Sequence, residues 1–334
     1  MKIRNLFLSS LSFLLFTNSI FATKNIEKKT EVRHLMQIDD LTKEELFSIL
    51  DYAAKIKENP ANYSSVLSGK TLLMFFEKQS LRTRLSFETG MTQLGGHAIF
   101  YSFKDSPLGK KESIEDTARC VSRFCDIAMI RANKQSDIRS FAENVSIPVI
   151  DALSDNAHPC QIIADLLTMR EKGKDIEKMK LCYLGNGNNN LTFDLIRVGA
   201  LLENPITVGC PSDPEFNVPK DIIDEVKGAV TIVHNVEEAA KDADVIYADT
   251  WVNYGIPLEY LEIRKKTLMP FQVNAEAMKL AKKDAIFMNC LPAMRGCEQT
   301  SDVIDGPQSV VFDEAENRLH GQKALMLFLL GLDY

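Results

Sequence analysis

From residue 31 onward, short apolar runs alternate with stretches in which apolar residues recur at helical spacing. The first helical stretch follows Thr42 and Glu45, which have the spacing of a capping box, and its apolar residues stand at positions 46, 49, 50 and 53. Apolar runs bounded by helices are typical of parallel strands buried on both faces. The predicted strands form two series along the chain, first 71–76, 98–103, 126–131 and 148–152, then 180–184, 206–210, 230–234, 244–249, 285–290 and 309–312.

Two series of strands joined by a helical stretch at 159–171 predict an α/β protein with two doubly wound parallel-sheet domains and a cleft between them. The length of 334 residues is sufficient for two domains. We expect an extension over 1–30, a first domain over 31–155, an interdomain helix over 156–175 and a second domain over 176–313. A C-terminal helix over 314–334 is expected to return to the first domain.

The first 22 residues differ from the rest of the chain. Lys2 and Arg4 precede an apolar stretch at 6–16, and Ala22 follows Ile20, which stands where a signal-peptide cleavage site prefers a small residue. Two interpretations stay open: a secretory signal peptide, or an upstream start codon that adds a disordered tail to a cytoplasmic protein. No other run is long and apolar enough to span a bilayer.

Composition narrows the class of function. Lys and Arg number 39 and Asp and Glu number 46, and the resulting net charge of −7 argues against a nucleic-acid-binding protein. The seven cysteines are odd in number and include no C-x-x-C pair, which excludes a zinc ribbon and a dense disulfide framework. The five histidines are isolated, so we expect no metal site.

Ligands of open α/β sheets bind beyond the carboxyl ends of the strands. After the predicted strand at 71–76, Ser80 or Thr83 stands at a helix start, with Arg82 beside it. Free backbone N–H groups at a helix start and a guanidinium favour an anion such as phosphate. An ordinary helix cap with solvated arginines is the alternative.

Three further polar residues follow strands of the same series. Arg131 ends the predicted strand at 126–131, and His158 and Gln161 follow the strand at 148–152. A guanidinium, a neutral imidazole and an amide could all donate to one carbonyl oxygen, which is the arrangement that stabilises an oxyanion. Taken singly, Arg131 is typical of a surface charge and His158 of a helix-start residue.

The residues that follow the second series of predicted strands differ in chemical type from those of the first series. Residues 185–190 resemble a dinucleotide-binding turn but lack its third glycine, so we expect a small polar ligand or a simple turn instead. Asp249 follows another predicted strand, where it could hold an ammonium group or cap a loop. Cys290 precedes Leu291 and a proline, and no histidine adjoins it to activate the thiol, which leaves a binding or proton-handling role or a buried structural thiol.

Together these stretches, spanning about 300 residues in the same order, resemble the ornithine carbamoyltransferases of the aspartate/ornithine carbamoyltransferase family. The matching motifs are Ser80-Leu81-Arg82-Thr83-Arg84, Lys111-Glu112-Ser113, Asp116-Thr117-Ala118-Arg119, His158-Pro159-Cys160-Gln161, Gly187-Asn188-Asn189, Asp249-Thr250-Trp251, Cys290-Leu291-Pro292 and Asp313-Glu314-Ala315-Glu316-Asn317-Arg318.

The resemblance implies transfer of a carbamoyl group from carbamoyl phosphate to ornithine by a homotrimer or a multiple of trimers, without a metal or an organic cofactor. It implies that Arg131, His158, Gln161 and Cys290 are catalytic. It further implies binding of carbamoyl phosphate by these four with Ser80, Leu81, Arg82, Thr83, Leu291 and Arg318, and binding of ornithine by Asn189, Asp249, Asn253 and Tyr254. Because carbamoyl phosphate is labile and is made in the cytosol, a cytoplasmic location is expected, although the N-terminal segment leaves export open.

Several positions depart from the family pattern, and most of them lie on the amine side. They are Leu81, Pro107, Asn186, Asn253 with Tyr254, and Asn289. Three interpretations therefore remain: an ornithine enzyme, a carbamoyltransferase for putrescine or an acylated ornithine, and a weakened paralogue that binds without turnover. Retention of the arginines, His158, Gln161 and Cys290 argues against the last.

Overall fold

The computed structural model describes residues 32–103, 111–251 and 258–332 of the chain. A four-stranded parallel sheet occupies the first half, with β1 (Thr71–Phe76), β2 (His97–Ser102), β3 (Ile127–Arg131) and β4 (Val149–Leu153) in the order β2-β1-β3-β4. A five-stranded parallel sheet follows, with β5 (Leu181–Leu184), β6 (Ile206–Gly209), β7 (Val230–Val233), β8 (Val245–Tyr247) and β9 (Ile286–Met288) in the order β7-β6-β5-β8-β9. The predicted fold class is confirmed.

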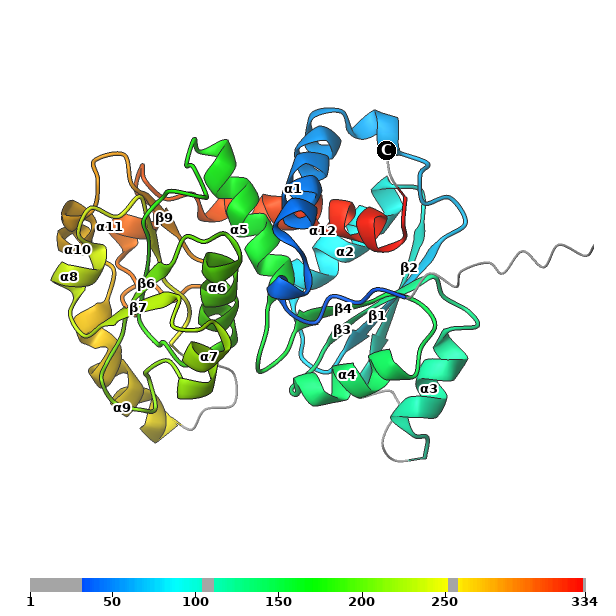
Figure 1. Cartoon of the computed structure of the whole chain (residues 1–334), viewed down its shortest axis with the longest axis horizontal. Helices are drawn as coiled ribbons and strands as arrows, with labels where there is room; N and C mark the ends of the chain where they lie inside the picture. The colour runs from blue at the N-terminus through cyan, green and yellow to red at the C-terminus, as the bar shows by residue number, and fades with distance from the viewer. Residues whose placement is uncertain (1–31, 104–110, 252–257, 333–334) are drawn as a thin grey trace, which may run out of the picture. The chain divides into compact units, whose positions relative to one another are not determined.

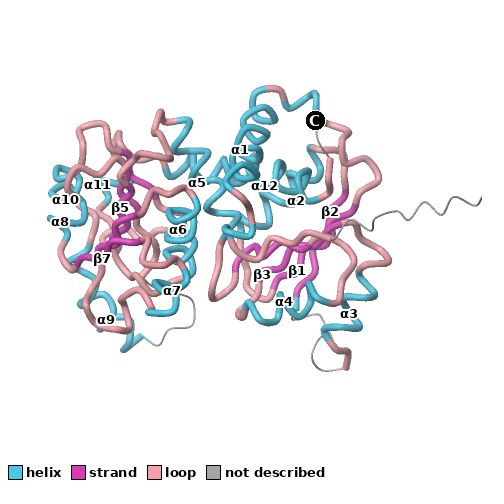
Figure 2. Tube along the Cα trace, viewed as in Figure 1, coloured by secondary structure: helices cyan, strands magenta, loops and turns pink. Residues whose placement is uncertain are grey.

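Helices cover both faces of each sheet (Figures 1 and 2). The first sheet has α3 (Ile114–Val121) and α4 (Gln135–Glu143) on one face and α1 (Lys43–Glu58), α2 (Leu81–Gln93) and α12 (Val311–Leu329) on the other. The capping box predicted for the first helix is present, with Thr42 as the N-cap of α1 and Glu45 as its partner. The helices of the second half are α5 (Pro159–Glu171), α6 (Asn190–Leu201), α7 (Lys220–Glu225), α8 (Val236–Ala240), α9 (Leu258–Leu268), α10 (Ala275–Leu280) and α11 (Ser301–Ile304).

The alternation of side chains along β1 explains why both faces need a cover. Leu72 and Met74 join the core cluster that includes α1, α2 and α12, whereas Leu73 and Phe75 join the cluster that includes α3 and α4. All four side chains are buried, as expected for a parallel strand between two helix layers. An apolar run without polar alternation is therefore the correct signal for these strands.

The predicted strand at 309–312 is wrong. Ser309 forms only an isolated bridge to Phe287, and α12 begins at Val311, three residues before the predicted start of the final helix. The apolar pair at 310 and 311 is buried because it enters a helix beside β9, and a run this short does not distinguish a strand from a helix start. As predicted, α12 returns to the first part of the chain, where it packs against α1, α2 and α5.

No helix within the described residues is long and apolar enough to cross a membrane.

Candidate active site

The order of the strands fixes where a ligand can bind. In the first sheet the chain runs outward from β1 to β2 and then returns to β3 on the other side, and in the second sheet β5 and β8 flank the same kind of reversal. Ligands of open α/β sheets bind at the carboxyl ends of the strands beside such a reversal. Ser80, Asn189 and Asp249 follow β1, β5 and β8, and Arg131 is the last residue of β3. The predicted site residues therefore lie at the carboxyl ends of the strands at these two points.

The segment after β1 forms the start of α2. Ser80 is the N-cap, as predicted, and its hydroxyl oxygen accepts a hydrogen bond from the backbone N–H of Thr83 at 3.3 Å. The first N–H groups of a helix lack intrahelical acceptors, and the helix dipole adds partial positive charge at the same end. This helix start, with half-buried Arg82 in its first turn, has the chemistry of an anion site. Leu81 contributes only its backbone to this chemistry, because its side chain is 68% exposed.

Arg131 is the last residue of β3 and is half-buried. Burial lowers the pKa of its guanidinium to about 10, and the nearby positive charges of Arg318 and Arg82 contribute to the shift in the same direction. Its Nε atom is buried and has no hydrogen-bond partner within the described part of the chain. The positive charges of Arg82 and Arg318 disfavour the charge of Arg131, and an anion bound beside Arg131 would offset this effect.

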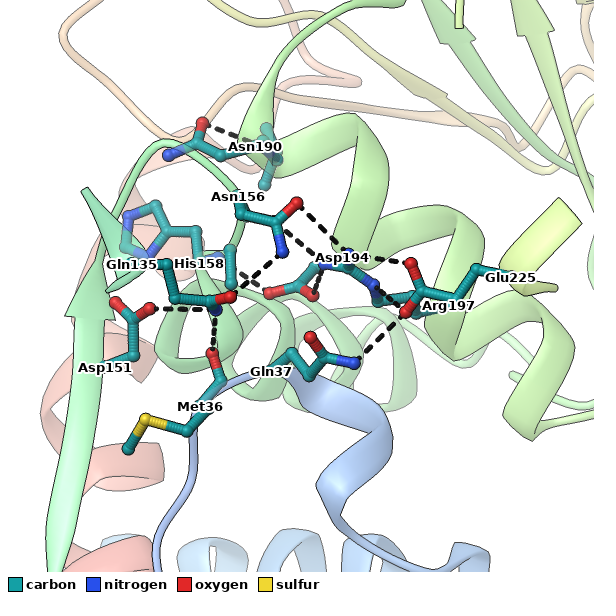
Figure 3. A network of polar contacts seen from close by, with 12 residues as sticks. Met36, Gln37, Gln135, Asp151, Asn156, His158, Asn190, Asp194, Arg197 and Glu225 are labelled. Carbon is teal, nitrogen blue, oxygen red and sulfur yellow. Dashed lines mark hydrogen bonds and ion pairs between the residues drawn. The ribbon is translucent and has the colours of Figure 1, made fainter. Parts of the chain in front are cut away.

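His158 is the N-cap of α5 and is buried. Burial lowers the pKa of its imidazole well below the ordinary value, and the charges of Arg318 and Arg131 contribute to the shift. The ring is therefore neutral at pH 7, and its Nδ1 has no partner among the described residues. Its backbone N–H donates to Asp194 Oδ2 at 2.7 Å, which anchors the residue from α6 (Figure 3). A neutral imidazole beside an anion site is suited to donate a hydrogen bond to a polarised oxygen.

Gln161, one turn into α5, is fully engaged by protein groups. Its Nε2 donates to Asp165 Oδ1 at 2.8 Å and to Glu314 Oε1 at 3.0 Å, and its Oε1 accepts from Arg318 Nη1 at 2.8 Å. The amide predicted to polarise a substrate carbonyl thus holds the Arg318 guanidinium in this structure.

Two buried carboxyl groups in this cluster, Asp165 and Glu314, were not among the predicted site residues. Glu314 also accepts from the Tyr247 hydroxyl at 2.9 Å and from the backbone N–H of Asn289 at 3.0 Å. Burial raises the pKa of Asp165 to about 7 and raises that of Glu314 well above its ordinary value, with the Asp165 carboxyl adding to the latter shift. An acidic residue inside the otherwise apolar stretch 162–167 is the sequence signal that would have drawn attention to Asp165.

The second sheet contributes an acceptor and a thiol. Cys290, two residues after β9, is half-buried, and its Sγ donates to Asp249 Oδ1 at 3.2 Å. Loss of surrounding water and the Asp249 carboxylate raise the pKa of Cys290 well above that of a free thiol, and burial also raises the pKa of Asp249. Cys290 is therefore a thiol and not a thiolate at pH 7, which disfavours a nucleophilic role. Leu291 follows with φ of 53°, and its N–H donates to the Asn289 side chain at 2.9 Å.

Asn189 is the N-cap of α6, where its side-chain oxygen accepts from the N–H of Thr192 at 2.9 Å and its Nδ2 donates to the Tyr183 hydroxyl at 2.9 Å. Asn186 shapes the same turn through two hydrogen bonds with the backbone of Asn188. The predicted residues Asn253 and Tyr254, and the departure at Pro107, lie outside the described residues. Among the residues that are described, no group of three or more His, Cys, Asp or Glu side chains is placed to hold a metal ion.

Comparison with known proteins agrees with this geometry. Residues 33–171 match the domain family described as "Aspartate/ornithine carbamoyltransferase, carbamoyl-P binding domain", and residues 177–329 match "Aspartate/ornithine carbamoyltransferase, Asp/Orn binding domain". The ornithine carbamoyltransferase of Pyrococcus horikoshii is 45% identical over 306 residues, covering 90% of this chain and 96% of that protein. That of Caldicellulosiruptor saccharolyticus is 44% identical over 307 residues, covering 89% and 98%.

Solved structures extend the likeness to three dimensions. The ornithine carbamoyltransferase of Pyrococcus furiosus superposes with a TM-score of 0.84 at 42% identity, over 91% of this chain and 98% of that one. The ornithine transcarbamoylase of Giardia lamblia gives a TM-score of 0.83 at 40% identity, over 91% and 100%. The two domain models of one family, and relatives that carry its name, thus match nearly the whole chain from residue 33 to residue 329. The protein belongs to the aspartate/ornithine carbamoyltransferase family.

Proposed function

We propose that this protein transfers the carbamoyl group of carbamoyl phosphate to the δ-amine of L-ornithine, giving L-citrulline and phosphate, in arginine or citrulline metabolism. The observation that carries the proposal is that Arg131 and Arg318 lie near the neutral imidazole of His158 and that Arg82 lies near Arg131. Such a site combines strong attraction for a phosphate with a hydrogen-bond donor for an adjacent carbonyl.

The phosphate of carbamoyl phosphate binds at the start of α2, through the first backbone N–H groups of the helix and the Arg82 guanidinium. Arg131 and His158 donate to the carbonyl oxygen as negative charge develops on it. Gln161 supports this step by holding Arg318, in keeping with its observed hydrogen bonds. Arg318 in turn contacts the carbamoyl phosphate.

The ornithine end binds on the second sheet. Asp249 attracts the α-ammonium group and Asn189 contacts the carboxylate, with Asn253 and Tyr254 completing the pocket. The neutral δ-amine attacks the carbonyl carbon, a carbon–nitrogen bond forms and the carbon–oxygen bond to phosphate breaks. The departing phosphate takes up the proton that the attacking nitrogen loses. Cys290 and Leu291 lie beside the amine, where the Cys290 thiol, already paired with Asp249, orients the nucleophile without attacking the substrate.

We further propose that the chain assembles as a homotrimer or a multiple of trimers. Four large apolar side chains on α2 and β2 are exposed: Leu81 68%, Leu85 54%, Ile99 40% and Phe100 37%. Exposed apolar clusters of this kind mark protein interfaces, and β2 is an edge strand with unpaired backbone groups. Analytical ultracentrifugation of the protein and of Leu85→Glu tests this proposal: a trimer mass that the substitution reduces supports it, and a wild-type monomer contradicts it.

A cytoplasmic location is proposed because the labile donor is made in the cytosol. Cell fractionation of the full chain tests it, and a periplasmic protein cleaved near Ala22 would contradict it.

The activity is tested by measuring ureido product formed from carbamoyl phosphate with ornithine, putrescine or N-acetylornithine as the acceptor. We expect ornithine to give the highest kcat/KM. Preference for putrescine or acetylornithine would transfer the proposal to that amine, for which the Asn253-Tyr254 sequence is the favouring observation. No product with any amine would contradict carbamoyl transfer. The substitution Lys220→Met, which removes an exposed charge paired with Asp224 on α7, is the matched control for variants of the arginine cluster.

A further inference from the structure

A buried ion pair on α6 lies against the turn that carries His158 (Figure 3). Asp194 and Arg197 are one helical turn apart, and Arg197 Nη1 lies 3.0 Å from Asp194 Oδ1. Their side chains are 0% and 1% exposed. A buried ion pair often adds less stability than apolar residues of the same volume, so stability alone is a weak reason for its presence.

Both members of the pair hold the backbone of the turn at 154–158. Asp194 Oδ2 accepts from the His158 N–H at 2.7 Å, and Arg197 Nη1 donates to the carbonyl oxygen of Asn156 at 2.8 Å. A third contact from α6 is made by Asn190, whose Nδ2 donates to the carbonyl oxygen of Ser154 at 2.6 Å. Alternate residues of the turn are thus fixed by one helix, and that helix follows β5 of the second sheet.

The pair is itself held in place from the opposite side. Arg197 makes two hydrogen bonds to the Glu225 carboxylate, at 2.9 Å and 3.1 Å, and Gln37 donates to the same carboxylate at 3.1 Å. The side chain of Asn156 is fixed in the same way, since its Nδ2 donates to Gln135 Oε1 at 3.0 Å. Arg197 therefore has little freedom to move, and neither has the peptide of Asn156 that it holds.

We infer that Asp194 and Arg197 are positioning residues for His158, which set where the imidazole points in the carbamoyl transfer proposed above. The reason is geometric: the imidazole makes no hydrogen bond through Nδ1 within the described residues, so its place depends on the backbone that carries it. A displacement of about 1 Å in a positioned group costs up to about 100-fold in rate. The phosphate-binding start of α2 lies on a different element and is left unchanged.

The test compares Arg197→Met and Asp194→Asn with Lys174→Met. Lys174 is a matched control because it is also a buried cation, bonded to the carboxylate of Asp284 at 2.9 Å and to its carbonyl oxygen at 2.7 Å, and it belongs to no part of the proposed site. We expect Arg197→Met to lower kcat by about 10–100-fold while the dissociation constant for carbamoyl phosphate, from calorimetry, stays within about 3-fold of wild type. Lys174→Met is expected to keep the wild-type kcat, although it too loses thermal stability.

The second readout is the ¹⁵N spectrum of the His158 imidazole in the substrate-free protein. We expect its resonances to move in Arg197→Met and Asp194→Asn and to stay in place in Lys174→Met. Unmoved resonances, or a kcat for Arg197→Met that matches that of Lys174→Met at equal folded fraction, would overturn the inference. Because the spectrum needs no substrate, it still tests the positioning of His158 if the wild-type protein transfers no carbamoyl group, an outcome that counts against the proposed function alone.

Discussion

Substitution of Glu314 by Ala tests whether the buried carboxyl pair joins the two halves of the site. Glu314 accepts hydrogen bonds from Tyr247, Gln161 and the backbone N–H of Asn289, and it is fully buried. After truncation Gln161 keeps Asp165 as its acceptor, whereas the Asn289 N–H and the Tyr247 hydroxyl lose the acceptor they had.

A buried donor left unpaired costs about 1–3 kcal/mol, so two of them cost about 2–6 kcal/mol. Relaxation of the surrounding side chains offsets part of this, and we expect a net loss of about 2–4 kcal/mol in the free energy of unfolding at pH 6. Glu314→Gln keeps one acceptor oxygen and the volume of the side chain, so we expect it to lose less than half as much.

The direction of the two pKa shifts also predicts how the effect of Glu314→Ala on stability changes with pH. The pKa values of both carboxyl groups are raised in the folded protein, that of Asp165 to about 7. Stability that depends on their protonated forms is fully present below the unfolded pKa values near 4 and is lost as the pH rises through 7. The difference in the free energy of unfolding between the wild type and Glu314→Ala should therefore become smaller between pH 6 and pH 8.

Urea unfolding at pH 6, 7 and 8 measures these differences. Glu316→Ala is the control, because Glu316 lies on the same helix with its side chain 54% exposed and 3.7 Å from Lys57. A loss below about 1 kcal/mol for Glu314→Ala at pH 6, no larger than that of an ordinary surface substitution, would refute the account of the pair.

Three other predictions follow from the site. Arg82→Ala should weaken carbamoyl phosphate binding at least about 10-fold in calorimetry, because one charge-assisted contact to phosphate is worth about 1.5–3 kcal/mol. The control Lys220→Ala should leave the affinity unchanged, and equal affinity in both variants counts against the phosphate site. Asp151→Asn should gain stability relative to the wild type as the pH rises from 5 to 8. Burial raises the pKa of Asp151 to about 8, so only the wild type loses free energy of unfolding over this pH range. Parallel curves of unfolding free energy against pH would contradict the shift. The double substitution Asn253→Ser, Tyr254→Met, at positions outside the described residues, should raise kcat/KM for ornithine by about 10-fold with carbamoyl phosphate affinity unchanged, and a loss of ornithine activity would favour another amine.

The fold was predictable because most of its strands are buried on both faces, β2 and β7 at the sheet edges being the exceptions. Runs such as 71–76 and 181–184 contain no charged or amide side chain, and in a chain of alternating elements that pattern is typical of strands between two helix layers. The run at 309–312 failed because it is similarly apolar but too short, and what decides its structure is the helix that follows, not its own composition.

The polar cluster behind the site was less accessible to sequence reasoning. Gln161 and Glu314 are 153 positions apart and meet only because α12 packs on α5. Asp194 and Arg197 are one turn apart on α6, but the pattern of a single helix cannot show that they bind the backbone of His158 and Asn156. Residues that bind a ligand follow strand ends and can be predicted from that position, whereas residues that hold them in place depend on packing between distant elements.

In the proposed reaction the arginine cluster binds the phosphate of carbamoyl phosphate while the carbamoyl carbon passes to the δ-nitrogen of ornithine. Its most direct test is an NMR time course with [¹³C]carbamoyl phosphate and [δ-¹⁵N]ornithine, recorded with the wild type and with Arg131→Met. In the wild type we expect a ureido ¹³C signal that is split by ¹⁵N coupling and grows in step with free phosphate. In Arg131→Met we expect a large fall in this rate. Phosphate release without a ¹³C–¹⁵N bond, or an unchanged rate in Arg131→Met, would contradict it.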